Sequence, residues 1–138
     1  MYIFTTCYTH VWKGDESMTK QHEIRIQDKL NTDYDAGLAT LPVVKDADTR
    51  ASYADMFKAF GDETRLKLIS FLTTAPACLC EMVDALSIAN STITHHLKLL
   101  ERGGVVQKEK IGKFTVYQLT DTTLVHHLLQ LLSEGEAR

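Results

Sequence analysis

A change of hydrophobic period along residues 53–119 constrains the fold of this chain more than any other feature. Apolar residues recur at spacings of three and four in four consecutive stretches, which predicts four amphipathic helices. Residues 105–110 and 114–119 are rich in Val, Phe, Tyr and Thr and flank a glycine-containing turn, which predicts a β-hairpin. The helical positions are Tyr53, Met56, Phe57 and Phe60, then Leu66, Ile69 and Leu72, then Leu79, Met82, Val83 and Leu86, then Ile93, Leu97 and Leu100. The expected fold class is mainly α with a small β-hairpin.

Residues with special backbone preferences mark where these elements should end. Helix ends are expected at Gly61, before Pro76 and at Gly103 and Gly104, and capping side chains at Asp62 and at Asn90 or Ser91. A last helix is expected after the hairpin, capped by Thr120 or Asp121. Its apolar residues are Leu124, Val125, Leu128, Leu129, Leu131 and Leu132. This surface is wider than one stripe, so the helix should pack on two partners, of which a second subunit is the natural candidate.

The first third of the chain differs from the rest. Residues 1–50 contain eight acidic and six basic residues and only short apolar stretches, with one short helix expected around residues 23–30. We therefore predict an N-terminal arm, residues 1–48, that carries Cys7, and a folded domain over residues 49–138.

Composition narrows the class of protein. The chain has 138 residues and a net charge of −3, and no apolar run approaches the roughly 18 residues that span a bilayer. Residues 1–4 are too short for the apolar region of a signal peptide, so a cytoplasmic protein is expected. Three cysteines, an odd number, argue against a disulfide framework and favour metal ligands or reactive thiols.

The third and fourth predicted helices, the turn between them and the hairpin follow the order of a winged helix-turn-helix. The fourth helix carries Ser91, Thr94, His95 and Lys98 at spacings of three and four, opposite its apolar face. Hydroxyl and imidazole groups can reach base edges in a major groove about 12 Å wide. A merely solvated helix face would look similar, but the complete order of elements favours DNA binding.

Basic residues gather at the predicted hairpin although the chain as a whole is acidic. Residues 91–113 contain five basic and two acidic residues, a local net charge of +3. Lys108, Lys110 and Lys113 flank the hairpin tip, where contacts with phosphates are expected.

Several segments together resemble one family. Residues 60–69 (FGDETRLKLI) and residues 91–100 (STITHHLKLL) are similar to two segments of the ArsR/SmtB metalloregulatory repressors, the second being their recognition helix. Residues 104–106 and 113–119 resemble that family's wing. The resemblance covers about residues 50–133. It implies a homodimer paired through its first and last helices on an inverted-repeat operator, with Asn90, Ser91, Thr94 and His95 facing the DNA.

The pair Cys78 and Cys80 falls at the start of the third predicted helix. On a regular helix these residues would lie about 200° apart and could not share a metal ion. Chelation therefore requires Cys78 to be extended, at or before the helix N-cap, and Pro76 favours such an entry. A helix N-terminus also stabilises the thiolates that metals need. The alternative is that these cysteines are only small buried hydrophobic residues.

The family resemblance implies that this Cys-x-Cys pair is a soft-metal or metalloid site. The arm resembles that of the cadmium- and lead-responsive (CadC-like) branch, which implies that Cys7 joins Cys78 and Cys80, with His10 as a possible fourth ligand. Three sulfurs suit Pb(II) or As(III), and an added nitrogen suits Cd(II) or Zn(II). The chain departs from these patterns by having one arm cysteine and no third cysteine on the helix.

The family's other metal site, on the last helix, is not expected here. Asp121 is present, but Thr123 and Glu134 stand where that pattern has histidines. Asp121 should instead cap the helix, and His126 and His127 should lie at or near the dimer interface.

The expected function is that of a metal-responsive repressor whose apo dimer binds operator DNA and is released by a thiolate-bound ion. A thiol-redox-responsive repressor of the same fold is the alternative. No enzyme or organic cofactor is expected, because the sequence contains no nucleophile–base–orienter set and no glycine-rich phosphate loop. A metal carrier would leave the basic hairpin unexplained.

Overall fold

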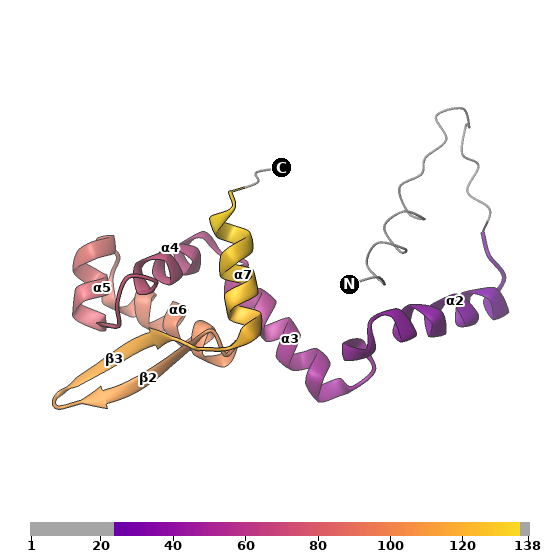
Figure 1. Cartoon of the computed structure of the whole chain (residues 1–138), viewed down its shortest axis with the longest axis horizontal. Coiled ribbons are helices and arrows are strands. Elements are labelled where there is room, and N and C mark those ends of the chain that lie inside the picture. The colour runs from indigo at the N-terminus through magenta and orange to yellow at the C-terminus, as the bar shows by residue number, and fades with distance from the viewer. Residues whose placement is uncertain (1–23, 136–138) are drawn as a thin grey trace. The chain divides into compact units, whose positions relative to one another are not determined.

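The computed structural model describes residues 24–135 (Figure 1). The chain divides into two units, residues 1–47 and residues 48–138. The described part of the first unit contains α2 (Gln27–Thr40) and the short 3₁₀ helix η1 (Pro42–Val44). The second unit contains, in chain order, α3 (Ala47–Phe60), α4 (Glu63–Leu72), β1 (Ala77–Cys78), α5 (Leu79–Leu86), α6 (Asn90–Arg102), β2 (Val106–Ile111), β3 (Phe114–Leu119) and α7 (Thr123–Ser133). Among the described residues, no helix is both long enough and apolar enough to span a bilayer.

Helix α2 is longer than the sequence predicted, since it continues to Thr40 rather than ending near residue 30. Asp33 accepts hydrogen bonds from Arg25 and Lys29, both at 2.6 Å, and these ion pairs support the first half of the helix. None of its residues is buried. The division of the chain falls at the end of this unit, and the role of residues 1–48 as an arm stays a prediction.

The core of the second unit forms where the apolar faces of α4, α5 and α6 meet the start of β2. Leu68, Met82, Ile93, Leu100 and Val105 are fully buried. The helical spacing in the sequence identified the buried face of α6 correctly and the buried Met82 of α5. On α4 it was right for Ile69 and Leu72, but it included the half-buried Leu66 and missed the fully buried Leu68. The mainly helical winged helix-turn-helix fold is confirmed, with α5 and α6 as the helix-turn-helix and β2–β3 as the wing.

The sheet has one more strand than the sequence predicted. Its order is β1–β3–β2, and all neighbours are antiparallel. Strand β1 has only two residues, too few for a periodic signal, and its Cys78 pairs with Val116 of β3. The wing is thereby hydrogen-bonded to the segment that enters α5.

Two predicted caps are wrong. Helix α6 has Ala89 as its N-cap without a capping side chain, so Asn90 is already its first helical residue. At α7 the cap is Thr122, whose hydroxyl accepts from the backbone N–H of Val125 at 3.3 Å. Thr120 instead donates to the carbonyl of Gly104, and Asp121 lies 2.6 Å from His126 Nε2. Thr120 and Asp121 are thus engaged with other partners, and Thr122 caps α7, whereas α6 begins without a capping side chain.

Candidate nucleic-acid interface and thiol pair

Helix α6 separates an apolar face from a polar one, as the sequence predicted. Ile93, Leu97 and Leu100 are buried in the core. Four of the predicted DNA contacts on this helix are exposed, namely Asn90, Ser91, His95 and Lys98. The core therefore holds α6 so that one polar face is available to a ligand.

Thr94, the fifth predicted contact on α6, is half-buried. Its hydroxyl lies 2.8 Å from the carbonyl oxygen of Asn90 and 3.2 Å from Asn90 Oδ1. The hydroxyl hydrogen is thus used within the helix, where it contacts the backbone and the side chain of Asn90.

A buried arginine that the sequence analysis did not single out ties α6 to its neighbours. Arg65 of α4 donates from Nε to the carbonyl of Ala59 at 2.9 Å and from Nη2 to that of Lys58 at 2.7 Å. Its Nη1 lies 3.2 Å from Nδ1 of His96 on α6. Arg65 therefore joins the end of α3, the start of α4 and the flank of α6. A buried guanidinium gives no periodic signal, so the sequence could not have revealed this role.

Asp62 completes this cluster at the N-terminus of α4. Its carboxylate accepts the backbone N–H of Arg65 at 3.0 Å, which confirms the predicted cap, and lies 3.7 Å from His96 Nδ1. The backbone N–H of Arg65, together with the charges of Arg65 and His96, holds the pKa of Asp62 below its usual value. Asp62 is therefore negatively charged near neutral pH, where it accepts the backbone N–H of Arg65.

The three lysines of the hairpin are not equivalent. Lys108 lies 3.0 Å from the carboxylate of Glu101, and the hydrogen bond and charge of Glu101 raise the pKa of Lys108. Within residues 24–135, neither Lys110 nor Lys113 makes an ion pair. The Nζ of Lys113 instead lies 5.3 Å from the centre of the Phe114 ring. The charges of Lys110 and Lys113 are thus the ones left available at the hairpin.

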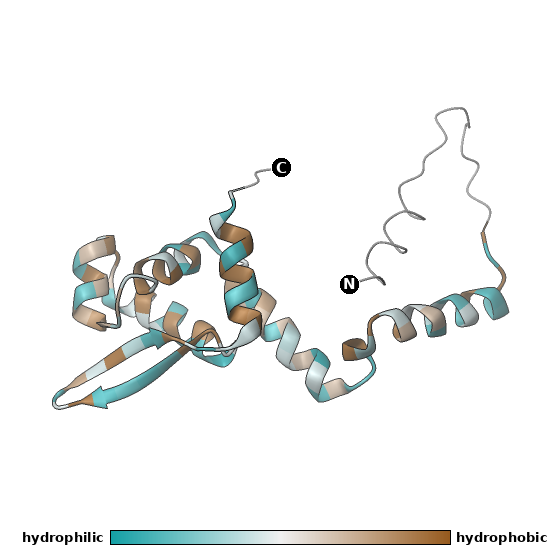
Figure 2. Cartoon of the chain, viewed as in Figure 1, coloured by the Kyte–Doolittle hydropathy of each residue, from teal (hydrophilic) through white to brown (hydrophobic). Residues whose placement is uncertain are grey.

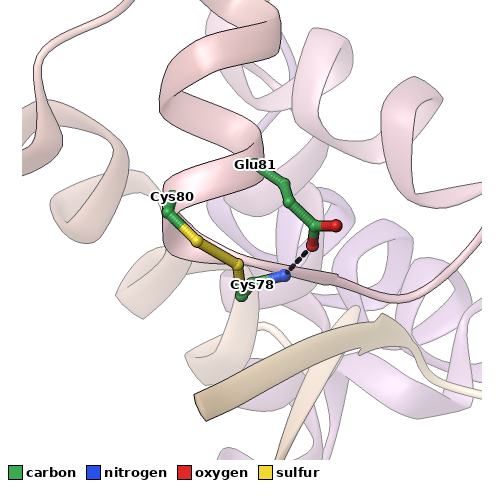
Figure 3. The surroundings of a disulfide bond; sticks show 3 residues. All are labelled: Cys78, Cys80 and Glu81. Carbon is green, nitrogen blue, oxygen red and sulfur yellow. Dashed lines mark hydrogen bonds between the residues drawn. A yellow bond between two sulfur atoms is a disulfide. The ribbon is translucent and has the colours of Figure 1, made fainter.

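The backbone at Cys78 has the extended conformation that would allow the sulfurs of Cys78 and Cys80 to approach each other. Cys78 is the N-cap of α5 in extended backbone, with φ −83° and ψ 166°, and Cys80 lies in the first turn. Their Cα atoms are 5.5 Å apart and a disulfide joins their sulfurs (Figure 3). The backbone N–H of Cys78 donates to the carboxylate of Glu81 at 2.7 Å. The two sulfurs can therefore meet on one side of the helix start.

The other predicted metal ligands, Cys7 and His10, lie outside the described residues. Over the described range, no cluster of three or more Cys, His, Asp or Glu side chains is arranged to hold a metal ion. A site of Cys7, Cys78, Cys80 and His10 accordingly stays a prediction.

A helix-turn-helix with an exposed polar second helix, followed by a hairpin with basic residues, defines a winged helix-turn-helix regulator. The family described as "Bacterial regulatory protein, arsR family" matches residues 62–108, from the cap of α4 into the wing. The chain is 37% identical over 82 residues to an uncharacterised HTH-type transcriptional regulator of Methanocaldococcus jannaschii, covering 59% of this chain and 91% of that one. This protein belongs to the arsR family of transcriptional regulators.

Two further comparisons give a similar regulatory protein and a similar fold. The cadmium resistance transcriptional regulatory protein CadC homologue of Staphylococcus aureus is 33% identical over 83 residues, covering 59% of this chain and 65% of that protein. The solved structure of HlyU from Vibrio cholerae matches with a TM-score of 0.58 and 25% identity, covering 67% of this chain and all of that one.

Proposed function

We propose that this protein is a homodimeric repressor that binds operator DNA in its metal-free form and is released by a soft metal or metalloid ion. The observation that carries the proposal is the position of the thiol pair. Cys78 and Cys80 lie at the N-terminus of α5, the first helix of the same helix-turn-helix whose second helix presents the polar face. A ligand on the thiols is therefore bound to the DNA-reading unit itself.

The proposed DNA contacts combine base reading and phosphate binding. Asn90, Ser91 and His95, with Thr94 behind them, would face base edges in the major groove. Lys98, Lys110 and Lys113 would contact phosphates, and Lys108 would contribute less because of its pairing with Glu101. The inverted-repeat operator follows from the proposed two-fold symmetry.

The proposed dimer would form through α3 and α7. Phe57 on α3 is 57% exposed, and Leu131 and Leu132 on α7 are 66% and 50% exposed. Figure 2 shows brown, apolar residues along α7 alternating with hydrophilic ones. Large apolar side chains left uncovered by their own chain are typical of subunit interfaces.

The proposed effector site joins Cys78 and Cys80 with Cys7 and, as a fourth ligand, His10. Soft thiolate ligands favour Cd(II), Pb(II) and As(III), and an S₃N set also suits Zn(II). The name of the Staphylococcus aureus relative, a cadmium resistance regulatory protein, supports a soft ion. We place the protein in the cytoplasm, where such thiols stay reduced, and assign it no enzymatic activity. Coupling of ion and DNA binding is typically about 1–3 kcal/mol.

The disulfide favours a second candidate, a repressor that responds to oxidation. A peroxide would oxidise the two thiols of Cys78 and Cys80 to the disulfide and be reduced to water or an alcohol, with no metal involved. Release of DNA by peroxide, without release by Cd(II), Pb(II) or As(III), would select this candidate.

An anaerobic ultraviolet titration of the reduced protein with Cd(II), Pb(II) and As(III) tests the effector site. We expect thiolate charge-transfer bands that saturate at one ion per subunit and are altered in Cys7→Ser. With a DNA duplex selected for binding to the metal-free protein, Cys78→Ser and Cys80→Ser should keep DNA binding and lose release by metal. Absence of bands with all three ions would overturn the metal-responsive proposal, and loss of DNA binding by the metal-free variants would make the thiols structural.

The DNA-binding part of the proposal needs a separate measurement. We expect His95→Ala to weaken binding to the selected duplex by about 1–3 kcal/mol and to relax its sequence preference. Ser70→Ala, at an exposed position on α4 outside the proposed DNA and dimer contacts, is the control for the DNA contact. Equal affinities for His95→Ala and the wild type would contradict the assigned reading face.

A further inference from the structure

The described part of the second unit exposes large apolar side chains in two places. Phe57, Leu131 and Leu132 lie on α3 and α7, where the proposed dimer would cover them. Ile111 and Phe114 lie on the wing and are 55% and 49% exposed. The proposed dimer and the proposed DNA contacts thus leave the apolar part of the wing without a function.

Ile111 and Phe114 form a pair at the end of the hairpin. They are Cα partners, so their side chains lie on the same face of the sheet, one on each side of the two-residue turn of Gly112 and Lys113. Gly112 has φ +60°, a conformation typical of such tight turns. Figure 1 shows the hairpin of β2 and β3 projecting from the helices, with this turn at its far end. The hairpin therefore ends in a narrow tip that carries two apolar side chains.

The inner side of this pair is supported by the rest of the sheet and by the start of α5. A groove of about 310 Å³ lies between the tip and the thiol pair, and it is lined by Cys78, Cys80, Glu81, Ile111, Phe114 and Val116. The register explains this composition, because Cys78 pairs with Val116 on the face that also carries the tip pair. The tip side chains are thus backed on one side and half exposed on the other.

Positive charge accompanies the apolar pair. Lys110 precedes Ile111 and Lys113 precedes Phe114, and neither lysine makes an ion pair within residues 24–135. The Nζ of Lys113 lies 5.3 Å from the centre of the Phe114 ring, within cation–π range. Glu109, which shares the face of Ile111, lies two residues back from the tip. The tip therefore suits a narrow groove with apolar walls and negatively charged rims.

The minor groove of DNA has these properties. It is about 6 Å wide and about 7.5 Å deep, and phosphates border it on both sides. Some proteins insert Phe or Ile side chains between base steps in this groove, which partly unstacks the bases and bends the duplex. An apolar pair flanked by lysines is thus a chemical match for the minor groove, whereas the major groove is read by the polar face of α6.

The length of β2 allows the tip to reach this groove. Strands rise about 3.3 Å per residue, so Ile111 stands about 17 Å beyond Val106. Only residues 103–105 separate β2 from α6, and Lys108 lies 3.0 Å from Glu101 of that helix. A helical turn of DNA spans about 34 Å, so neighbouring major and minor grooves are about 17 Å apart. With α6 in the major groove, the tip therefore reaches the adjacent minor groove.

We propose that Ile111 and Phe114 insert into the minor groove beside each half-site and select a base step there that unstacks easily. The inference deepens the proposed function, because it rests on binding of α6 to operator DNA. Pyrimidine–purine steps such as TA and CA are easily kinked, whereas A-tracts are stiff. The wing thereby adds sequence preference at positions that α6 does not contact, and it bends the DNA.

The test uses the reduced, metal-free full chain and the duplex selected for binding to it. The base pairs outside the half-sites are randomised, and the flanks that the wild type enriches are sequenced. Anisotropy compares the affinities for duplexes with enriched flanks and with A-tract flanks, and energy transfer between dyes at the two duplex ends measures bending. The variants are the double variant Ile111→Ser with Phe114→Ser, Lys113→Ala, and Thr115→Ala as a control, because Thr115 is exposed on the opposite face of β3.

We expect the wild type to enrich TA or CA steps and to bind these flanks about tenfold more tightly than A-tract flanks. The double variant should bind both kinds of flank with the weaker affinity and bend the duplex less. Lys113→Ala should weaken both equally and keep the preference, because phosphate contacts carry no sequence information. Thr115→Ala should behave as the wild type. Both tip residues are half exposed, so the double variant is expected to fold, which circular dichroism checks.

Failure of this inference differs from failure of the proposed function. If the double variant keeps the flank preference and the bending of the wild type, the inference is overturned. It is also overturned if the wild type enriches no flanking step. In both cases the proposed function stands as long as His95→Ala relaxes the sequence preference within the half-sites. If the wild type binds no duplex with sequence preference, both are overturned.

Discussion

The two elements that we expect to contact DNA, α6 and the wing, are held in very different ways. Ile93, Leu97 and Leu100 anchor α6 in the core, whereas only Val106 of β2 is buried. Figure 2 accordingly shows β2 in mostly hydrophilic colours. Strand β2 of the wing is held by backbone hydrogen bonds to β3, and β3 is hydrogen-bonded in turn to β1 at Cys78. Substitutions behind α6 should therefore unfold the protein, whereas substitutions on the wing should change ligand binding and leave the fold intact.

The largest expected effect is that of a core substitution behind α6. Leu97→Ala should lower the free energy of unfolding by about 3 kcal/mol, because it leaves a cavity at a side chain that is 1% exposed. Ile111→Ala on the wing, where the side chain is 55% exposed, should change it by about 0.5 kcal/mol. Urea denaturation of both variants measures the difference, and similar losses would contradict the contrast between the two elements.

A second test concerns the close approach of α6 and α3. A Cβ at Gly103 would lie 2.7 Å from the Cβ of Ala59 and 2.8 Å from the carbonyl oxygen of Asp55. Gly103→Ala should therefore cost about 1–3 kcal/mol through overpacking. Gly37→Ala on α2 is the matched control, since within residues 24–135 no atom beyond the neighbouring residues and the helix's own backbone lies within 4 Å of its Cβ position, and it should stabilise that helix by up to about 1 kcal/mol. A neutral Gly103→Ala would mean that α6 can shift without cost.

The lysines of the wing should differ in how much they contribute to DNA binding. Lys113→Ala should make the slope of log K against log salt shallower by about 0.9 for each lost phosphate contact, with little change in sequence preference. Lys108→Ala should have a smaller effect, because Glu101 already neutralises part of its charge. Fluorescence anisotropy with the selected duplex at several salt concentrations measures both slopes. An equal or larger change for Lys108→Ala would show that the ion pair opens on DNA.

The smallest expected effect is a pH dependence at Asp62, the N-cap of α4. The pKa of Asp62 is lower in the folded protein than its usual value, so its stabilisation is complete above about pH 4 and is lost as the pH falls through the folded pKa. Asp62→Asn keeps a capping side chain and removes the charge. Thermal unfolding should show the wild type to be more stable near pH 7, with the difference shrinking below about pH 4. A difference independent of pH would mean that the charge contributes nothing.

Much of the fold and part of the candidate site could be predicted because periodic signals are local. The buried face of α6, much of that of α4 and α5, and the hairpin follow from the spacing of apolar residues, although the fully buried Leu68 was missed. Strand β1, the true caps of α6 and α7 and the role of Arg65 could not be predicted. Each depends on a partner that is distant in sequence or on a choice among adjacent polar residues, and neither leaves a periodic trace.

The sequence by itself determined the winged helix-turn-helix order and the polar face of α6, because hydrophobic period and local spacing decide both. It left open whether Cys78 and Cys80 bind a metal ion or react with oxidants, and in the structure a disulfide joins them. Only the tertiary structure decided that Lys108 is paired while Lys110 and Lys113 are not, and that the thiols share a groove with Ile111 and Phe114. The shared groove depends on the register of the sheet, which pairs Cys78 with Val116 of β3 across more than 30 residues of chain. The pairing of Lys108 depends on the position of β2 beside Glu101 at the end of α6.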